Sequence, residues 1–224
     1  VLASGLIEEL SADGSVLPLA EVDCSVVGNP EGIVRVFETQ KLPFLSWPFE
    51  WPFSVLKAAA LLHLDLQLRA LDRNITLSDA SAYNIQFQGA KPVFIDHLSF
   101  RPYVEGEIWG GHRQFCKQFL NPLILASTVG VMPNDWYRGS QEGLSTVDLA
   151  PLIPFRNKFC WPMFMHVFMQ DRLDRAIVAD GESVDTRAIS KAKLPKVAQL
   201  NMIRSLKNWI SGMKPLGGAT VWRD

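Results

Sequence analysis

The sequence predicts an α+β protein that is mainly helical and contains one β-hairpin. Apolar residues recur at helical spacing over 54–72, 112–127 and 194–213. Apolar and polar residues alternate over 33–42, as in a half-buried strand, and two shorter strand patterns flank the turn "GAK". These periodicities indicate a small mixed N-terminal part, followed by a helical part in which the hairpin is embedded.

The first fifty residues change pattern several times. Residues 2–10 have the spacing of an amphipathic helix, and 16–27 are predicted to be extended. The connector "PFLSWPFEWPF" at 43–53 contains three prolines and five aromatic residues. This composition excludes a helix and favours a rigid segment packed by its aromatic rings.

A long helix is predicted over 54–72 because this segment is apolar around most of its circumference, as in a helix at the centre of a domain. Ser54 is a candidate N-cap for it. After the hairpin, the chain is expected to be loop-like over 101–111. Further helices are predicted at 112–127, after a cap at Ser145 or Thr146, at 162–176 and at 194–213.

The composition is that of an ordinary globular protein and excludes several classes of partner. Hydrophobic residues make up 48% and charged residues 20% of the 224 residues, enough for one large domain or two small ones. A net charge of -1 provides no basic field for nucleic acid or an anionic membrane, and no apolar run reaches the roughly 18 residues of a membrane helix. We therefore expect no nucleic-acid partner, no membrane partner and a cytoplasmic location.

The cysteines and histidines do not predict a metal site. The chain has three widely separated cysteines, Cys24, Cys116 and Cys160. This odd number fits buried, reduced thiols better than a disulfide framework or a zinc site. His112 and His166 lack metal-ligand spacing. His63 is expected in the core, and His97 is either a proton carrier or, as we favour, a packing residue at a strand end.

Three polar residues at fixed intervals form the basis of the functional prediction. Asn84 follows Asp79 by five residues, and Asp96 follows Asn84 by twelve, across the predicted hairpin. Because a hairpin brings its ends side by side, Asn84 and Asp96 are expected at one mouth, with Asp79 on the preceding loop. Phosphoryl transfer requires a carboxylate to orient the acceptor hydroxyl and oxygen ligands for magnesium, and protein kinases place an Asp and an Asn five residues apart. We predict Asp79 as the catalytic residue, Asn84 and Asp96 as metal ligands, and Mg²⁺ and ATP as cofactors.

Each of these residues also has a structural explanation. Asp79 could cap a turn, Asn84 could take a left-handed turn position, and Asp96 could end a strand. The joint spacing favours a shared kinase-like geometry, whereas retained catalysis is the weaker hypothesis. Ser78 and Ser81 have no glycine elbow around them, so nucleophilic hydrolysis is not favoured.

This stretch resembles the protein-kinase-like superfamily, and most closely the aminoglycoside-phosphotransferase style of that fold, in which the last acid lies in an Ile-Asp-aromatic run, here at 95–97. The resemblance implies a truncated small lobe at 1–45 and a helical large lobe at 46–190. It also implies a helix and linker toward a following domain at 191–224, where the basic, amphipathic pattern favours a solvated helix over a membrane or RNA contact.

The same resemblance implies roles for residues upstream of the hairpin. Glu8 or Glu9 in the first helix would pair with a nucleotide-binding lysine. The segment at 42–51 would be the hinge between the lobes, where Leu45, Ser46 and Trp47 would contact the nucleotide. Packing of the connector's aromatic rings is the alternative explanation for this segment.

The chain also resembles a narrower family over nearly its whole length. The runs "PFEWPFSVLKAAALLHLDLQLRAL", "LSDASAYNIQF", "KPVFIDHLSF" and "HRQFCKQFLNPL" are similar to the long bacterial proteins described as nodulation-related or SAM-dependent methyltransferases. In those proteins, a kinase-like region precedes a methyltransferase domain. The resemblance implies that this chain is an internal piece, that its partner is the C-terminal methyltransferase domain, and that S-adenosylmethionine binds outside this chain.

Some features depart from the kinase pattern and leave three functions open. Leu77-Ser78 precede Asp79 where kinases have His-Arg, His97-Leu98 replace Phe-Gly, and the first 45 residues contain no glycine-rich loop or nucleotide lysine. The first hypothesis is a degenerate kinase-like domain that regulates the methyltransferase or presents substrate to it. The second is an active Mg/ATP-dependent phosphotransferase with an unknown acceptor, and the third is a helical interaction module without nucleotide.

Overall fold

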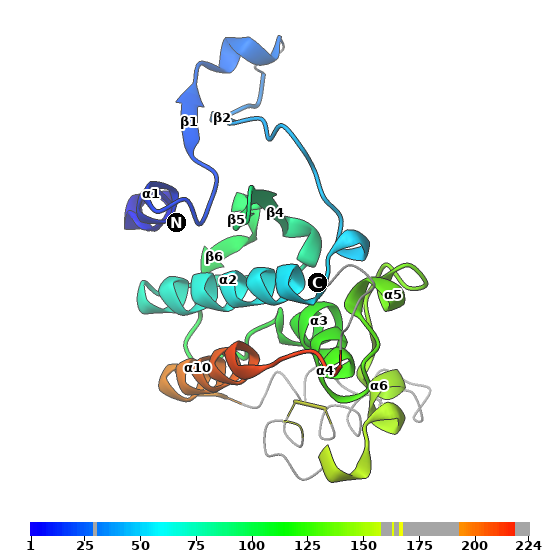
Figure 1. The fold of residues 1–224 in the computed structure, drawn as a ribbon. Coiled ribbons are helices and arrows are strands. Elements are labelled where there is room, and N and C mark those ends of the chain that lie inside the picture. Colours follow the sequence, from blue (N-terminus) through cyan, green and yellow to red (C-terminus); the bar gives the residue numbers. More distant parts are fainter. Residues whose placement is uncertain (29–30, 158–162, 164–165, 168–192, 218–224) are drawn as a thin grey trace.

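The computed structural model describes residues 1–28, 31–157, 163, 166–167 and 193–217, and Figure 1 shows their arrangement. Three two-stranded antiparallel sheets lie among the helices of this part of the chain, which confirms the α+β class. The helix predicted at 162–176 lies almost wholly outside the described residues. No helix in the described part is long and apolar enough to cross a bilayer.

The N-terminal elements are shorter than the sequence predicts. Helix α1 (Leu6–Ala12) begins after Gly5, whose φ of 69° separates it from a 3₁₀ turn at Leu2–Ser4. Strands β1 (Leu19–Val22) and β2 (Val36–Thr39) pair into an antiparallel ribbon. The ribbon extends away from the helices in Figure 1, and none of its strand residues is buried. Only four residues of the predicted strand 33–42 are paired.

The second half of the predicted extended segment 16–27 is also not a strand. The chain turns into a 3₁₀ helix at Cys24–Val27 because Asp23 caps it, accepting a hydrogen bond of 2.8 Å from the main-chain nitrogen of Ser25. An Asp side chain that satisfies a main-chain donor two residues on competes with strand pairing. The expectation of a continuous extended segment was therefore wrong at its C-terminal end.

Helix α2 (Phe53–Asp72) follows the connector, which itself contains a 3₁₀ turn at Pro48–Glu50. The predicted N-cap Ser54 lies inside the helix. The helix begins one residue earlier because the carbonyl of Pro52 accepts hydrogen bonds from the nitrogens of Val55 and Leu56, each at 3.1 Å. Half of the α2 side chains are buried, as its apolar circumference predicts.

The predicted hairpin is present as β4 (Ile85–Gln88) and β5 (Lys91–Phe94), joined by Gly89 with φ of 62°. A second pair, β3 (Ile75–Leu77) with β6 (Phe100–Pro102), was missed, and Arg101 and Pro102 of β6 lie in the stretch predicted to be loop-like. All three β3 residues are buried, so this short strand shows no alternation that would distinguish it from a loop.

The helical half follows the prediction closely. The helix predicted at 112–127 is α3 (His112–Phe115), a π-helical turn (Cys116–Leu120) and α4 (Asn121–Thr128) in one continuous run. A short helix, α5 (Pro133–Tyr137), lies between the helix predicted at 112–127 and the one predicted after Ser145 or Thr146. Ser145 caps α6 (Thr146–Leu152) by accepting from the nitrogen of Asp148 at 3.1 Å, and a 3₁₀ turn follows at Phe155–Asn157.

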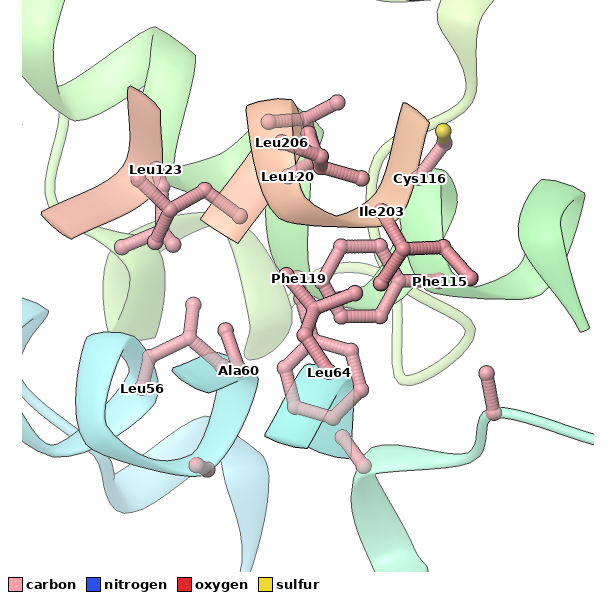
Figure 2. Packing of buried hydrophobic residues seen from close by; sticks show 14 of the residues in the cluster. Leu56, Ala60, Leu64, Phe115, Cys116, Phe119, Leu120, Leu123, Ile203 and Leu206 are labelled. Atoms are coloured by element: carbon pink, nitrogen blue, oxygen red, sulfur yellow. The ribbon is translucent and has the colours of Figure 1, made fainter. Parts of the chain in front are cut away.

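The last helix, α10 (Lys196–Gly212), lies beside α2 in Figure 1. In Figure 2, Ile203 and Leu206 of α10 meet Phe119 and Leu120 of the π-helical turn, and the α2 side chains complete the cluster. These side chains are at most 1% exposed. The burial of this apolar surface is the main stabilising contribution to the helical half.

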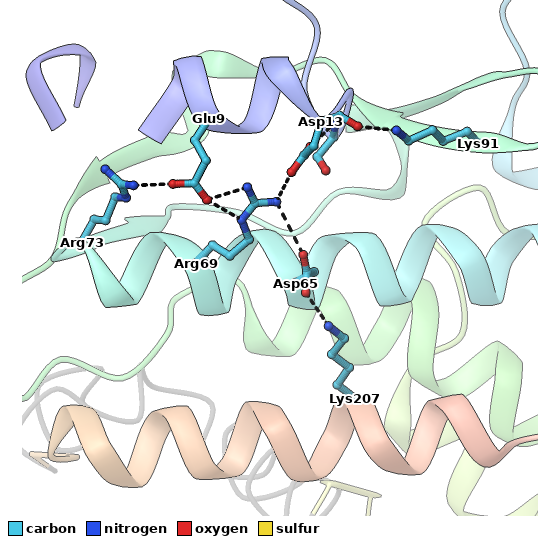
Figure 3. Close-up of polar contacts among 8 residues, drawn as sticks. Glu9, Asp13, Asp65, Arg69, Arg73, Lys91 and Lys207 are labelled. Atoms are coloured by element: carbon cyan, nitrogen blue, oxygen red, sulfur yellow. Dashed lines mark hydrogen bonds and ion pairs between the residues drawn. The ribbon is translucent and has the colours of Figure 1, made fainter. Parts of the chain in front are cut away.

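A polar layer links α1 and α10 to the opposite sides of α2 (Figure 3). Arg69 of α2 pairs with Glu9 and Asp13 of α1, each at 2.6 Å, and Lys207 of α10 pairs with Asp65. Arg73 contacts the other oxygen of Glu9. Hydrogen bonding by Arg69, aided by Arg73, lowers the pKa of the Glu9 carboxyl. Glu9 is thus paired with arginines of α2, in contrast to the lysine partner that the kinase resemblance implies.

His63 is buried inside a ring of aromatic side chains. The centroids of Phe94, Trp109 and Phe119 each lie 5.8 Å from the imidazole centroid, and that of Phe115 lies 6.0 Å away. Burial lowers the pKa of His63 to about 3, and the main chain of Asp79 opposes this shift only in part. The expectation of a core histidine is confirmed, and the imidazole is neutral in the folded protein at pH 7.

His63→Leu is expected to reduce the acid sensitivity of the fold. The unfolded chain binds a proton at His63 below pH 6.5, whereas the folded chain does not until about pH 3. Lowering the pH from 7 to 5 therefore costs the native protein about 2 kcal/mol through this residue alone. Urea unfolding at both pH values should show a correspondingly smaller loss in the variant. Equal losses in the two proteins would mean that His63 takes up a proton in the fold.

Candidate functional site

Asp79, Asn84 and Asp96 come from three turns that meet where two strand pairs converge. Asp79 lies two residues after β3, Asn84 ends a 3₁₀ turn before β4, and Asp96 lies two residues after β5. The nitrogen of Ile95 donates to the carbonyl of Asn84 at 2.9 Å, which closes the hairpin mouth. The nitrogen of Ser78 donates to the carbonyl of Ser99 at 2.8 Å, which extends the β3–β6 pair toward the same point.

The structure brings these three side chains into one hydrogen-bonded cluster. Nδ2 of Asn84 donates to Oδ1 of Asp79 and to Oδ2 of Asp96, each at 3.0 Å. The amide therefore lies between the two carboxylates. The expectation that Asn84 and Asp96 share one mouth of the hairpin, with Asp79 beside them, is confirmed as geometry. Their roles in catalysis and metal binding remain predictions.

Ser99 is a fourth member of this cluster that sequence reasoning missed. Its hydroxyl lies 2.5 Å from Oδ2 of Asp96 and 3.1 Å from Oδ1 of Asp79, and the residue is only 2% exposed. A hydroxyl has one proton, so it donates to one carboxylate at a time. The signal available in the sequence was the spacing of three residues from Asp96, which places Ser99 one 3₁₀ turn further along the chain.

Among the residues that the structure describes, no ion pair balances the charge of the cluster. In the described part of the chain, no lysine or arginine forms an ion pair with Asp79 or Asp96. Two carboxylates held this close repel one another unless a proton or a cation intervenes. The oxygens that Asp79, Asn84 and Asp96 provide are the hard ligands that Mg²⁺ prefers.

Two glutamines of the following helix hold the loop that carries Asp79. The nitrogen of Ala80 donates to Oε1 of Gln114 at 2.9 Å, and the nitrogen of Ala82 donates to Oε1 of Gln118 at 2.7 Å. Gly111 lies so close that a Cβ atom there would meet the Asp79 main chain at 2.9 Å. The loop therefore has a defined position relative to α3 and the π-helical turn.

A polar cleft of about 490 Å³ lies on this side of the loop. Gln114 and Gln118 line it, together with Lys117 and Glu142, whose charged groups are 3.7 Å apart. Gly110 also lines the cleft and lies beside the carbonyl of Ser78. The cleft is thus adjacent to the main chain that positions Asp79, and it offers both hydrogen-bonding and charged groups to a polar molecule.

The predicted nucleotide contacts in the connector have most of their main-chain groups already bonded. Gln86 of β4 accepts from the nitrogen of Ser46 at 2.9 Å and donates to its carbonyl at 3.0 Å. The nitrogen of Trp47 donates to Glu50 at 2.7 Å. The side chains of Leu45 and Trp47 are largely exposed. The side-chain amide of Gln86 therefore attaches the connector to the hairpin. It occupies both main-chain groups of Ser46, with which a nucleotide base would otherwise form hydrogen bonds.

The remaining polar residues of this region have structural partners. Nε2 of His97 lies 2.7 Å from the carbonyl of Leu17, which agrees with the packing interpretation of His97. The hydroxyl of Ser81 caps the following 3₁₀ turn by accepting from the nitrogen of Tyr83 at 3.3 Å. Neither arrangement resembles an activated nucleophile with its base.

His112 and His166 lack metal-ligand spacing in the sequence, but the structure brings them into contact. Nε2 of His112 lies 3.2 Å from Nδ1 of His166, and Sγ of Cys116 lies 3.8 Å from the same His112 nitrogen. Burial, with a smaller effect of His166, lowers the pKa of His112 to about 3, and burial lowers that of His166 to about 4. The four-residue spacing of His112 and Cys116 in a helix was the available signal, but the approach of His166 could not be deduced from it.

Comparison with known proteins provides one relative. The Nodulation protein NoeA of Rhizobium meliloti (strain 1021) is 40% identical over 223 residues, which is 99% of this chain and 47% of that protein. The chain thus spans about half the length of the curated relative it matches. No protein-family model matches the chain, and no solved structure matches it.

Gln86→Ala is expected to loosen the connector. It removes both hydrogen bonds to Ser46, and losing bonds of this kind at a buried position costs about 1–3 kcal/mol. Gln88→Ala is the matched control, because Gln88 lies at the exposed end of the same strand. Denaturant unfolding should show the loss for Gln86→Ala only. Equal stability of the two variants would show that the Gln86–Ser46 contact does not anchor the connector.

Proposed function

We propose that this chain is a kinase-like domain that binds a magnesium–nucleotide complex through Asp79, Asn84 and Asp96. The observation that supports this most directly is the single amide of Asn84 bonded to both carboxylates, at 3.0 Å each. The residues are separated by five and twelve positions, with a hairpin between the second and the third, which is the order that the kinase pattern requires.

The residues fit a magnesium ion after one local change. In the cluster, Asn84 directs its nitrogen toward the acids, and an amide nitrogen is not a metal ligand. Rotation of the amide by half a turn would direct its oxygen toward the same point, where Asp96 would supply the second ligand. Magnesium would there neutralise the phosphate charge of a nucleotide. Asp79, on the adjoining loop, would orient the acceptor hydroxyl and accept its proton.

The polar cleft is the place we propose for the acceptor. It lies against the loop of Asp79, and Gln114 and Gln118 both line the cleft and hold that loop. A volume of about 490 Å³ suits a small polar molecule or one side chain of a larger one. The chemical identity of the acceptor is not determined by this lining, because one kinase-like core serves many acceptors.

A degenerate kinase-like domain is the second candidate, and the connector favours it. The main-chain groups of Ser46 are both bonded to Gln86, and the Trp47 nitrogen is bonded to Glu50. A base that contacted Ser46 would have to displace the Gln86 amide. In this case the domain would regulate a neighbouring methyltransferase domain or present substrate to it.

The methyltransferase partner is a proposal in either case. It is supported by the sequence resemblance, and by the fact that the nodulation relative is about twice as long as the region it shares with this chain. S-adenosylmethionine would then bind in the other part of that protein. A purely helical interaction module is the remaining alternative, and the acidic cluster at the hairpin mouth has no role in it.

Asp96→Asn is expected to abolish the magnesium-dependent part of ATP binding. The substitution removes a charged oxygen ligand while keeping the size of the side chain, so the fold should be retained. Calorimetric titration of ATP into the full-length protein, with and without magnesium, measures the effect. Asp135→Asn, at an exposed position in α5, is the matched control and should bind like the unchanged protein.

Four results are distinguishable. Magnesium-dependent binding that is lost in Asp96→Asn supports the nucleotide site. If the folded protein does not bind ATP, but magnesium protects the region near Asp96 from hydrogen exchange, the result supports the degenerate domain. If there is neither ATP binding nor such protection, the result favours the interaction module. Binding with the same magnesium dependence in both variants would show that the proposed ligands are wrong.

A further inference from the structure

A second group of potential metal ligands shares no residue with the acidic cluster. His112 and Cys116 are four residues apart at the junction of α3 and the π-helical turn, so their side chains project from the same face of the helix. Sγ of Cys116 lies 3.8 Å from Nε2 and 4.0 Å from Nδ1 of His112. One helical turn therefore presents a sulfur and an imidazole nitrogen to the same point.

His166 completes this group from a distant part of the chain. Its Nδ1 atom lies 3.2 Å from Nε2 of His112, although the two residues are 54 positions apart. One ligand atom from each of His112, Cys116 and His166 lies within 4.8 Å of the other two. In the described part of the chain, no other group of three His, Cys, Asp or Glu side chains has ligand atoms placed for one metal ion.

Two of the three separations are close to the edges of a tetrahedral zinc site. Zinc–nitrogen bonds of about 2.0–2.1 Å and a zinc–sulfur bond of about 2.3 Å, at tetrahedral angles, place two nitrogens about 3.3 Å apart and a nitrogen and a sulfur about 3.6 Å apart. The measured separations are 3.2 Å for His112–His166 and 3.8 Å for His112–Cys116. The third separation, between Sγ of Cys116 and the ligand nitrogen of His166, is within 4.8 Å. Zinc binding would require these two atoms to approach each other by up to about 1.2 Å.

The surroundings favour a soft metal ion over a hard one. Cys116 is fully buried and His166 is 7% exposed, and the ring of Trp209 from α10 stacks on His166 with centroids 6.5 Å apart. The rings of Trp109 and His112 are inclined by 72°, with their centroids 6.2 Å apart. Nitrogen and sulfur donors in an apolar setting suit zinc and not magnesium, which requires oxygen ligands and retains water.

We propose that His112, Cys116 and His166 bind one Zn²⁺ ion, which cross-links the start of α3 to His166. The cysteine would bind as thiolate, releasing its proton to solvent, and the imidazoles would bind as neutral ligands. A water molecule or another ligand would occupy the fourth position. Because this site uses nitrogen and sulfur donors, it is chemically separate from the magnesium site proposed at Asp79, Asn84 and Asp96.

The alternative explanation is a packing contact. Two neutral imidazoles 3.2 Å apart can share a hydrogen bond, with one ring donating to the other, and the thiol can fill the space beside them. In that case the group needs no metal ion. Only the metal explanation predicts a bond between the ion and the Cys116 sulfur, so spectroscopy of a substituted metal can separate the two.

Cobalt substitution of the full-length protein is the direct test. Co²⁺ bound at His112, Cys116 and His166 should show intense visible bands of tetrahedral geometry and a near-ultraviolet thiolate-to-cobalt band, at one ion per chain. Addition of Zn²⁺ should remove both, whereas excess Mg²⁺ should not. The absence of a thiolate band from the folded, unchanged protein would overturn the proposal without requiring any variant.

Variants locate the site. Cys116→Ser should remove the thiolate band and weaken Zn²⁺ binding by about 100-fold or more, and His166→Gln should weaken it similarly. Cys24→Ser is the matched control, since Cys24 lies in the distant 3₁₀ helix Cys24–Val27, and it should keep the full band. Asp96→Asn should also keep it. Retention of the band in Cys116→Ser, or its loss in Cys24→Ser, would overturn the assignment.

Discussion

Helix α2 is the element on which the other parts of this structure depend. Its apolar residues form the core with the π-helical turn and α10, as Figure 2 shows. Its charged residues attach α1 on one side and α10 on the other. Its one buried amide, Gln67, accepts from the nitrogen of Leu77 at 2.8 Å and donates to the hydroxyl of Thr76 at 2.9 Å. A single helix thus fixes both the core and strand β3, from which the Asp79 loop emerges.

The Gln67 contacts explain how a short strand can hold the Asp79 loop in place. Strand β3 has only three residues and one partner strand, which is marginal by itself. The two buried hydrogen bonds to Gln67 would leave unpaired polar groups if β3 shifted by one residue, and such groups cost about 1–3 kcal/mol each. The π-helical turn holds the loop from its other side, because the side chain of Gln118 accepts a hydrogen bond from the nitrogen of Ala82. The main-chain carbonyl of Gln118 in turn accepts from the hydroxyl of Tyr137.

Periodic features of the fold could be predicted from the sequence, and features that depend on distant partners could not. The long helices and the β4–β5 hairpin follow from hydrophobic spacing, and the hairpin alone places Asn84 beside Asp96. The pairing of Glu9 with Arg69 and Arg73 depends on how α1 packs on α2, about sixty residues along the chain. The contact of His112 with His166 likewise spans 54 residues, and nothing local in the sequence indicates it.

The bonded connector does not by itself exclude a nucleotide. Gln86 makes two hydrogen bonds with Ser46, each with a net contribution of about 1 kcal/mol. A base that took over both bonds would form two hydrogen bonds of the same kind with Ser46, and water would solvate the displaced Gln86 amide. The free energy of this exchange is therefore close to zero.

The acidic cluster differs, because Asp79 and Asp96 share one amide and have no described cationic partner. Two unneutralised carboxylates disfavour the phosphates of a nucleotide unless a cation lies between them. In the proposed nucleotide site, affinity would therefore depend on a cation at the hairpin mouth more than on the connector.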